Sequence, residues 1–155
     1  GLEIPVVYNT GSYDKVETIR ELEGVVDIYM PDFKFWSHNL ALKTCSVLDY
    51  RQVAVNAIGE MYRQTAGLEI SDRGLARRGL LLRHLVMPGY TDDSKRILEH
   101  IKKEVSDNTY INIMGQYHPC GQSYGDASLG RALEHKEYRE VLEYAIKLGF
   151  QRIDY

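Results

Sequence analysis

Cysteine is scarce in this chain, and its scarcity excludes several kinds of site. The 155 residues contain two cysteines, Cys45 and Cys120, which lie far apart in the sequence. Neither has a cysteine or histidine at the spacing of a metal-binding motif. We therefore predict no metal site built from this chain alone. The low cysteine content also favours a reducing, cytoplasmic compartment.

Long apolar runs and an excess of one charge are also lacking. Nineteen Lys and Arg residues stand against 22 Asp and Glu, which gives a formal net charge of −3, and both signs are mixed along the chain. Such a balance provides no field that would attract nucleic acid or a membrane surface. The most apolar stretch is interrupted by Arg83 and His84, far short of the roughly 20 apolar residues that span a bilayer. We expect no nucleic-acid and no membrane partner.

Several familiar catalytic motifs are missing as well. The sequence has no glycine-rich phosphate loop and no G-x-S-x-G nucleophile motif, so most common enzyme classes gain no support. A chain of this length can bury one core, and we predict a single domain over residues 1–155. Because it begins at Gly1 and enters an apolar segment within a few residues, we expect it to be a piece of a longer protein.

The hydrophobic pattern alternates between two periods. Five runs rich in β-branched and aromatic residues predict buried strands, at residues 4–9, 25–35, 80–88, 109–118 and 150–154. Helical periodicity follows at residues 12–24, with Ser12 as its N-cap, and at 51–65, 91–105 and 136–148. Residues 68–79 and 120–131 indicate a turn and a loop. The alternation predicts an α/β fold with a parallel sheet, open or curled into a partial barrel.

Polar side chains cluster where the predicted strands end. In parallel α/β folds, ligands bind beyond the carboxyl ends of the strands, and Asn9, Thr10, Asp32 and Lys34 lie at such ends. Asp32 and Lys34 are two residues apart, so they face the same side of a strand. An acid and an amine on one face could hold a zwitterionic or hydroxyl-rich ligand. The alternative is a solvent-exposed salt bridge of little consequence.

Arginine and histidine add two further candidates. Arg83 lies inside an apolar strand, where an unpaired guanidinium would be costly to bury, so it should meet a carboxylate or a ligand anion. Asp32 is its natural partner, and a purely structural pair is an equal alternative. His118 ends another strand and could donate to a ligand or titrate near neutrality, or be an ordinary loop histidine. His84 should point toward a helix, on the opposite strand face from Arg83, and serve structure.

Four segments in order carry a family resemblance: YNTG at 8–11, DFK at 32–34, RHLVMPG at 83–89 and QYHP at 116–119. Together they resemble the radical S-adenosylmethionine (SAM) family, in particular the branch of pyruvate formate-lyase activating enzymes. The resemblance covers nearly the whole chain. It implies a partial (β/α)6 barrel of which the present strands correspond to the third to sixth.

The same resemblance implies a function. Members of the family are oxidoreductases that use a [4Fe–4S] cluster to cleave SAM reductively to a 5'-deoxyadenosyl radical, which abstracts hydrogen. It implies partners as well, namely a glycyl-radical enzyme or other protein substrate and an electron donor such as flavodoxin or ferredoxin. The residues implied to bind SAM, none of them catalytic, are Asp32, Phe33, Lys34, Arg83, His118, Asn9 and Thr10.

The departures from the family pattern are equally informative. Its C-x3-C-x2-C cluster motif and its GGE segment are absent. We therefore expect the chain to be the C-terminal portion of such an enzyme and to be inactive alone. Two other hypotheses stay open. One is a non-catalytic binding module that uses Asp32, Lys34 and His118. The other is an aldolase- or isomerase-type barrel with Lys34 as nucleophile or His118 as base.

Overall fold

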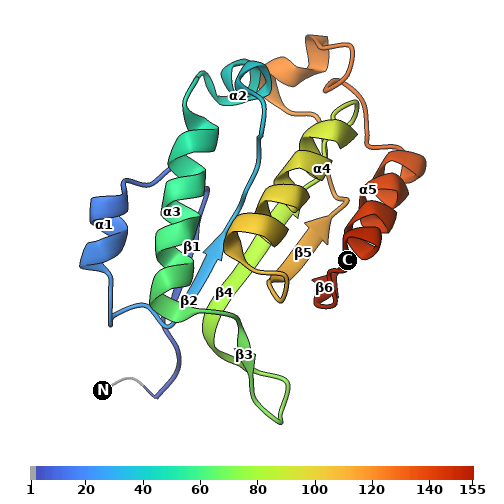
Figure 1. Ribbon diagram of the computed structural model, residues 1–155. Helices are drawn as coiled ribbons and strands as arrows, with labels where there is room; N and C mark the ends of the chain where they lie inside the picture. Colours follow the sequence, from blue (N-terminus) through green and yellow to red (C-terminus); the bar gives the residue numbers. More distant parts are fainter. Residues whose placement is uncertain (1–2) are drawn as a thin grey trace.

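A computed structural model describes residues 3–155 and contains one six-stranded sheet (Figure 1). Its strands are β1 (Val7–Thr10), β2 (Ile28–Pro31), β3 (Glu69–Ile70), β4 (Ala76–Leu85), β5 (Tyr110–Met114) and β6 (Ile153–Asp154). The order across the sheet is β1-β2-β4-β5-β6 with every neighbouring pair parallel, and β3 pairs antiparallel with β4. The predicted α/β fold with a parallel sheet is confirmed.

Helices cover one face of this sheet. They are α1 (Val16–Glu21), α2 (His38–Cys45), α3 (Tyr50–Thr65), α4 (Thr91–His100) and α5 (His135–Leu148), with a π-helical turn η1 (Ile101–Val105) and a 3-10 turn η2 (Gly121–Gly125). In Figure 1, α3, α4 and α5 lie side by side in front of the strands, with α1 beside α3. The opposite face carries no helix from residues 3–155. This consecutive, one-sided winding is compatible with a partial barrel.

The core lies between the sheet and the helices. Alternate strand residues such as Tyr29, Leu82 and Ile111 are fully buried and point at apolar residues of the helices. Burial of each large apolar side chain stabilises the fold by about 1.5–3 kcal/mol. The helix side chains that complete this layer are Ala54, Ile58, Met61, Ile97, Leu98, Val141 and Ala145. No helix within the described residues is long and apolar enough to cross a bilayer.

The start of the first helix corrects the sequence reading. Ser12 was expected to be its N-cap, but α1 begins at Val16 with Lys15 in the N-cap position. Ser12 instead adopts a left-handed backbone conformation with φ of 64° and is fully buried. Its hydroxyl donates to the Asp32 carbonyl oxygen at 2.8 Å. The Ser12 hydroxyl therefore ties the ends of β1 and β2 together.

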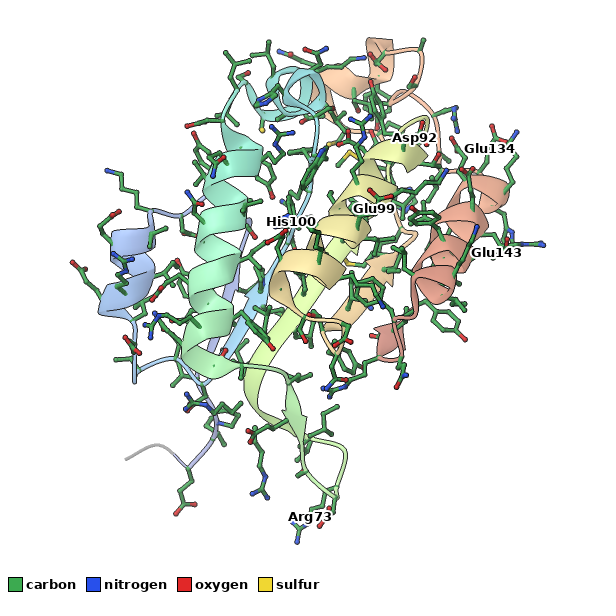
Figure 2. The ribbon with its side chains drawn as sticks, viewed as in Figure 1. Arg73, Asp92, Glu99, His100, Glu134 and Glu143 are labelled. Atoms are coloured by element: carbon green, nitrogen blue, oxygen red, sulfur yellow. The ribbon has the colours of Figure 1, made fainter. Side chains whose placement is uncertain are left out.

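The sequence did not predict helix α2 or the two strands of the hairpin at residues 68–79. Helix α2 is only eight residues long, and its start is fixed by a Ser37 N-cap whose hydroxyl accepts from the Leu40 amide at 3.4 Å. The segment 68–79 was predicted as a turn, and it forms a hairpin whose tip is held by Gly74 at φ of 76°. Arg73 at this tip projects away from the sheet (Figure 2). The predicted turn is correct, but β4 begins at Ala76 rather than residue 80.

Helix α5 is anchored through one carboxylate. Glu137 is buried and accepts two 2.7 Å hydrogen bonds from Arg131, one of 2.7 Å from the Gly89 amide and one of 3.0 Å from the Glu134 amide. Above all, the Arg131 guanidinium lowers the pKa of Glu137 from 4.5 to about 2. The carboxylate thus joins the start of α5 to the β4–α4 loop.

Glu137→Gln should lower the free energy of unfolding by about 2 kcal/mol at pH 7, because charge-assisted hydrogen bonds are lost. A depressed carboxyl pKa contributes stability above the unfolded pKa of 4.5, and that contribution is lost as the pH falls toward 2. Urea unfolding at pH 7 and pH 3 should therefore show the difference between wild type and variant shrinking at pH 3. Glu143→Gln, an exposed position on the same helix, should change stability by less than about 0.5 kcal/mol. A difference that is independent of pH would contradict this account.

Candidate functional site

An ion pair joins β2 and β4 at their carboxyl ends. Asp32 and Arg83 form a parallel bridge just beyond the regular pairing of the two strands. The Arg83 Nε and Nη2 atoms each lie 2.7 Å from Asp32 Oδ1. The side chains are 26% and 17% exposed, respectively, so a ligand on the open face of the sheet can reach them. The predicted pairing of Arg83 with Asp32 is confirmed.

Asn9 and Lys34 complete a cluster with this pair. Arg83 Nη2 donates to Asn9 Oδ1 at 3.1 Å, which brings in β1. Lys34 Nζ lies 3.6 Å from Asp32 Oδ2, with 40% of its side chain exposed. The four side chains share the face of the sheet that no described helix covers. We call Asn9, Asp32, Lys34 and Arg83 the open-face cluster.

The open-face cluster offers donors and acceptors in a small area. Two cations and one carboxylate give it a net charge of +1, and Asn9 can donate or accept. The Lys34 ammonium group lies beside Gly11, where a Cβ atom would be 3.8 Å from Lys34 Nζ, an ordinary van der Waals contact. An anionic group can bind the two cations while a hydroxyl or ammonium group of the same ligand binds Asp32. The cluster is suited to a small zwitterionic or hydroxyl-bearing ligand.

Two predicted site residues have side chains directed elsewhere. Phe33 is fully buried on the helix side, where its ring meets the His100 ring edge-on at 6.1 Å. His100 is the last residue of α4 and lies on the side of that helix that faces α3 (Figure 2). The Thr10 hydroxyl donates to the Asp14 carboxylate within the β1–α1 turn. Strand alternation explains both positions, because neighbours of Asp32 and Asn9 must face the other way. Neither side chain belongs to the open-face cluster.

His118 lies at the same end of the sheet as the cluster but outside it. It is exposed, in the segment that follows the carboxyl end of β5. Across residues 3–155 no side-chain hydrogen bond or ion pair of His118 is found. The structure therefore brings together Asp32, Lys34 and Arg83 and leaves His118 on the adjoining loop.

His84 is a structural residue, as its sequence position predicted. It is 2% exposed, and its Nδ1 lies 2.7 Å from the Phe33 carbonyl oxygen while its Nε2 lies 2.8 Å from Ser94 Oγ. A carbonyl can only accept, so Nδ1 carries the proton and Nε2 accepts from the serine. Burial lowers the pKa of His84, which keeps the ring neutral. The ring thereby connects the end of β2 to the first turn of α4.

Sequence reasoning missed three residues around the cluster. Asn112 is the register partner of Arg83 on β5, and its Nδ2 donates to Asp154 Oδ2 on β6 at 2.8 Å. Asn112 and Asp154 continue the polar side chains of the open-face cluster across the same face of the sheet. Asn112 alternates with buried neighbours such as Ile111, and this alternation in the sequence could have revealed it. Tyr50, at the start of α3, contacts the backbone of the cluster. No local pattern signals that role.

The chain does not supply the donors of an iron–sulfur cluster. Cys45 lies in α2 and Cys120 directly precedes η2, and both thiols are free and exposed. No group of three or more His, Cys, Asp or Glu residues that could hold a metal is found within residues 3–155. Two cysteines cannot provide three thiolates, so the residues present do not fit a [4Fe–4S] cluster.

Comparison with known proteins gives one informative relative. No family model matches the chain. It is 32% identical over 151 residues to the uncharacterized protein MJ0674 of Methanocaldococcus jannaschii. The match covers 97% of this chain and 40% of the archaeal protein. The chain thus spans well under half the length of the curated relative it matches.

Replacement of His84 by leucine should lower the free energy of unfolding by about 3 kcal/mol, because the Phe33 carbonyl and the Ser94 hydroxyl lose their buried partner. The pH dependence should change too. A histidine whose folded pKa is depressed loses stability as the pH falls below its unfolded value of 6.5, and the leucine variant should lack that slope. Urea titrations between pH 5 and 8 would measure both effects. His135→Leu, at an exposed position, is the control and should be near neutral. Equal stabilities for both variants would refute the role of His84.

Proposed function

We propose that this chain is the C-terminal, cosubstrate-binding portion of a radical SAM enzyme of the pyruvate formate-lyase activating type. The observation that carries the proposal is the open-face cluster, in which three segments of the resemblance meet at the ends of neighbouring parallel strands. These are the YNTG segment in β1, the DFK segment directly after β2 and the RHLVMPG segment that begins in β4. Three weak motifs that are distant in the sequence converge on one place.

The chemistry of the cluster suits the proposed cosubstrate. SAM carries a carboxylate, an ammonium group and two ribose hydroxyls. Lys34 and Arg83 can donate to the carboxylate or to ribose oxygens, while Asp32 can accept from the ammonium group or a hydroxyl. His118 would contact the cosubstrate from the loop after β5. The order of the motifs supports a role for this loop, because QYHP follows RHLVMPG in both the chain and the family.

The remaining parts of the proposal concern the longer protein. The [4Fe–4S] cluster, which supplies the electron for SAM cleavage, would be held by residues outside this chain. We further propose that β1, β2, β4 and β5 are the third to sixth strands of a (β/α)6 barrel, and that β6, which pairs parallel with β5, follows them. Their consecutive parallel order, with helices on one side only, supports that assignment. The residues described here would bind and orient the cosubstrate on the uncovered face.

The proposed partners follow from the family. A glycyl-radical enzyme or another protein would supply the hydrogen that is abstracted, and flavodoxin or ferredoxin would supply the electron. Nucleic acid and membranes are not proposed as partners, because charges of both signs are mixed along the chain. The scarcity of cysteine supports a cytoplasmic location.

The surroundings of Lys34 and His118 favour an aldolase or isomerase less than a SAM-binding site. A lysine that forms Schiff bases is usually desolvated or set beside another cation. Lys34 is 40% exposed and lies beside a carboxylate. A catalytic base is usually oriented by a third group, whereas His118 is exposed on a loop. A non-catalytic binding module would use the same cluster and is separated from an enzyme by the assay below.

The full-length protein, reconstituted anaerobically with iron and sulfide and then reduced, should convert SAM to 5'-deoxyadenosine and methionine. Liquid chromatography would quantify both products.

Lys34→Met should weaken SAM binding by about tenfold or more, because one charge-assisted hydrogen bond is worth about 1.5–3 kcal/mol. Lys136→Met is the matched control, since Lys136 lies on α5 and pairs with Glu134.

The outcomes separate the hypotheses. Binding of SAM without product in the reduced protein would favour a binding module. Absence of both binding and product would refute the radical SAM assignment. Equal affinities of Lys34→Met and Lys136→Met would remove the open-face cluster from the cosubstrate site.

A further inference from the structure

A single buried hydroxyl meets the backbone of both strand ends that form the open-face cluster. Tyr50 is the first residue of α3, and 3% of it is exposed. Its hydroxyl lies 2.9 Å from the Gly11 carbonyl oxygen and 2.8 Å from that of Asp32, and it accepts from the Lys34 amide at 2.9 Å. The three backbone groups belong to the chain just beyond β1 and β2.

These backbone groups lie where the sheet itself stops holding the chain. The last backbone hydrogen bonds between neighbouring strands here are two. The Asp32 amide donates to the Thr10 carbonyl at 2.8 Å, and the Phe33 amide donates to the Arg83 carbonyl at 2.9 Å. The next amide, that of Lys34, donates to the Tyr50 hydroxyl instead of to a strand. The hydroxyl therefore connects the backbone beyond β1 to the backbone beyond β2, where direct hydrogen bonds between the two strands end.

Proton counting explains why this arrangement needs a tyrosine. The phenol has one proton and can donate to one carbonyl at a time while accepting from the Lys34 amide. Ser12 Oγ already donates to the Asp32 carbonyl at 2.8 Å. The Tyr50 proton can therefore go to Gly11 without leaving Asp32 unsatisfied. A phenylalanine would fill the same space but would leave the Gly11 carbonyl and the Lys34 amide without this partner.

The ring that carries this hydroxyl is held firmly. Phe35 packs against it edge-on with ring centroids 5.0 Å apart, and Tyr13 stacks on it at 6.1 Å. These two ring contacts restrain the position of the hydroxyl, and the hydroxyl holds the Lys34 amide near the Gly11 carbonyl. The Lys34 ammonium group lies above Gly11. The position of that cation thus depends on Tyr50, which is too buried to touch a ligand itself.

We propose that Tyr50 is a positioning residue for the cosubstrate site and sets the spacing of Gly11, Asp32 and Lys34 for SAM. This inference rests on the proposed function. Binding sites lose affinity when supporting groups let their members drift by about 1 Å. Tyr50→Phe should weaken SAM binding by about tenfold.

The matched control is Tyr29→Phe. Tyr29 is also fully buried and its hydroxyl donates to Gln64 Oε1 at 2.7 Å, but this contact lies on the helix side of β2. Both variants delete one buried phenol hydroxyl, so both should lower the melting temperature, Tyr50→Phe by more because its hydroxyl has three partners and that of Tyr29 has one. Only Tyr50→Phe should lower the affinity of the full-length reconstituted protein for SAM, as measured by isothermal titration calorimetry. If Tyr50 were merely structural, both variants would bind SAM with the affinity of the wild type.

Hydrogen–deuterium exchange gives a readout that does not need SAM. The Lys34 amide should exchange faster in Tyr50→Phe than in wild type and should be unchanged in Tyr29→Phe. Wild-type affinity for SAM in Tyr50→Phe, or unchanged exchange at Lys34, would overturn the positioning role and leave the proposed function intact. Failure of the wild-type protein to bind SAM would overturn the proposed function and this inference with it.

Discussion

The structure depends on the way that β2 and β4 divide their side chains between two faces. Asp32 and Arg83 meet on the open face, while their neighbours Phe33 and His84 are buried under α4. Strand alternation makes these two arrangements inseparable, since a shift of one residue in either strand would expose the core and bury the ion pair. The register that packs the core is therefore the register that builds the open-face cluster.

The neutral His84 ring and the Tyr50 hydroxyl act as two supports of this register. His84 holds the Phe33 carbonyl from the helix side. Tyr50, at the start of α3, holds the Lys34 amide and the Gly11 carbonyl, and Ser12 donates to the Asp32 carbonyl. Between them, three successive residues of the DFK segment are fixed although β2 ends at Pro31. Such supports are what a binding site beyond the strand ends requires, because the sheet ladder no longer orients the chain there.

Much of this arrangement could be predicted from the sequence. A single arginine in an apolar strand required a partner, and two polar residues spaced by two had to share a face, which led to Asp32, Lys34 and Arg83. The same alternation gave His84 its structural role. These inferences succeed because they use strand geometry that tertiary context does not alter.

Other features depend on contacts that are distant in the sequence. Tyr50 is one of 12 tyrosines, and nothing local distinguishes the one whose hydroxyl reaches two strand ends. Helix α2 is short and is held by a cap and by packing. Ser12 looked like a helix cap, but its hydroxyl serves the Asp32 carbonyl across the sheet. Local pattern cannot rank such alternatives, because the partner is not nearby in the chain.

The central claim is that the open face at the ends of β1, β2 and β4 binds SAM. A crystal structure of the full-length protein with SAM bound tests it most directly. The account predicts that the methionine or ribose groups of the ligand lie within hydrogen-bonding distance of Asp32, Lys34 or Arg83. A ligand bound elsewhere, with these three side chains contacting only one another, would contradict it.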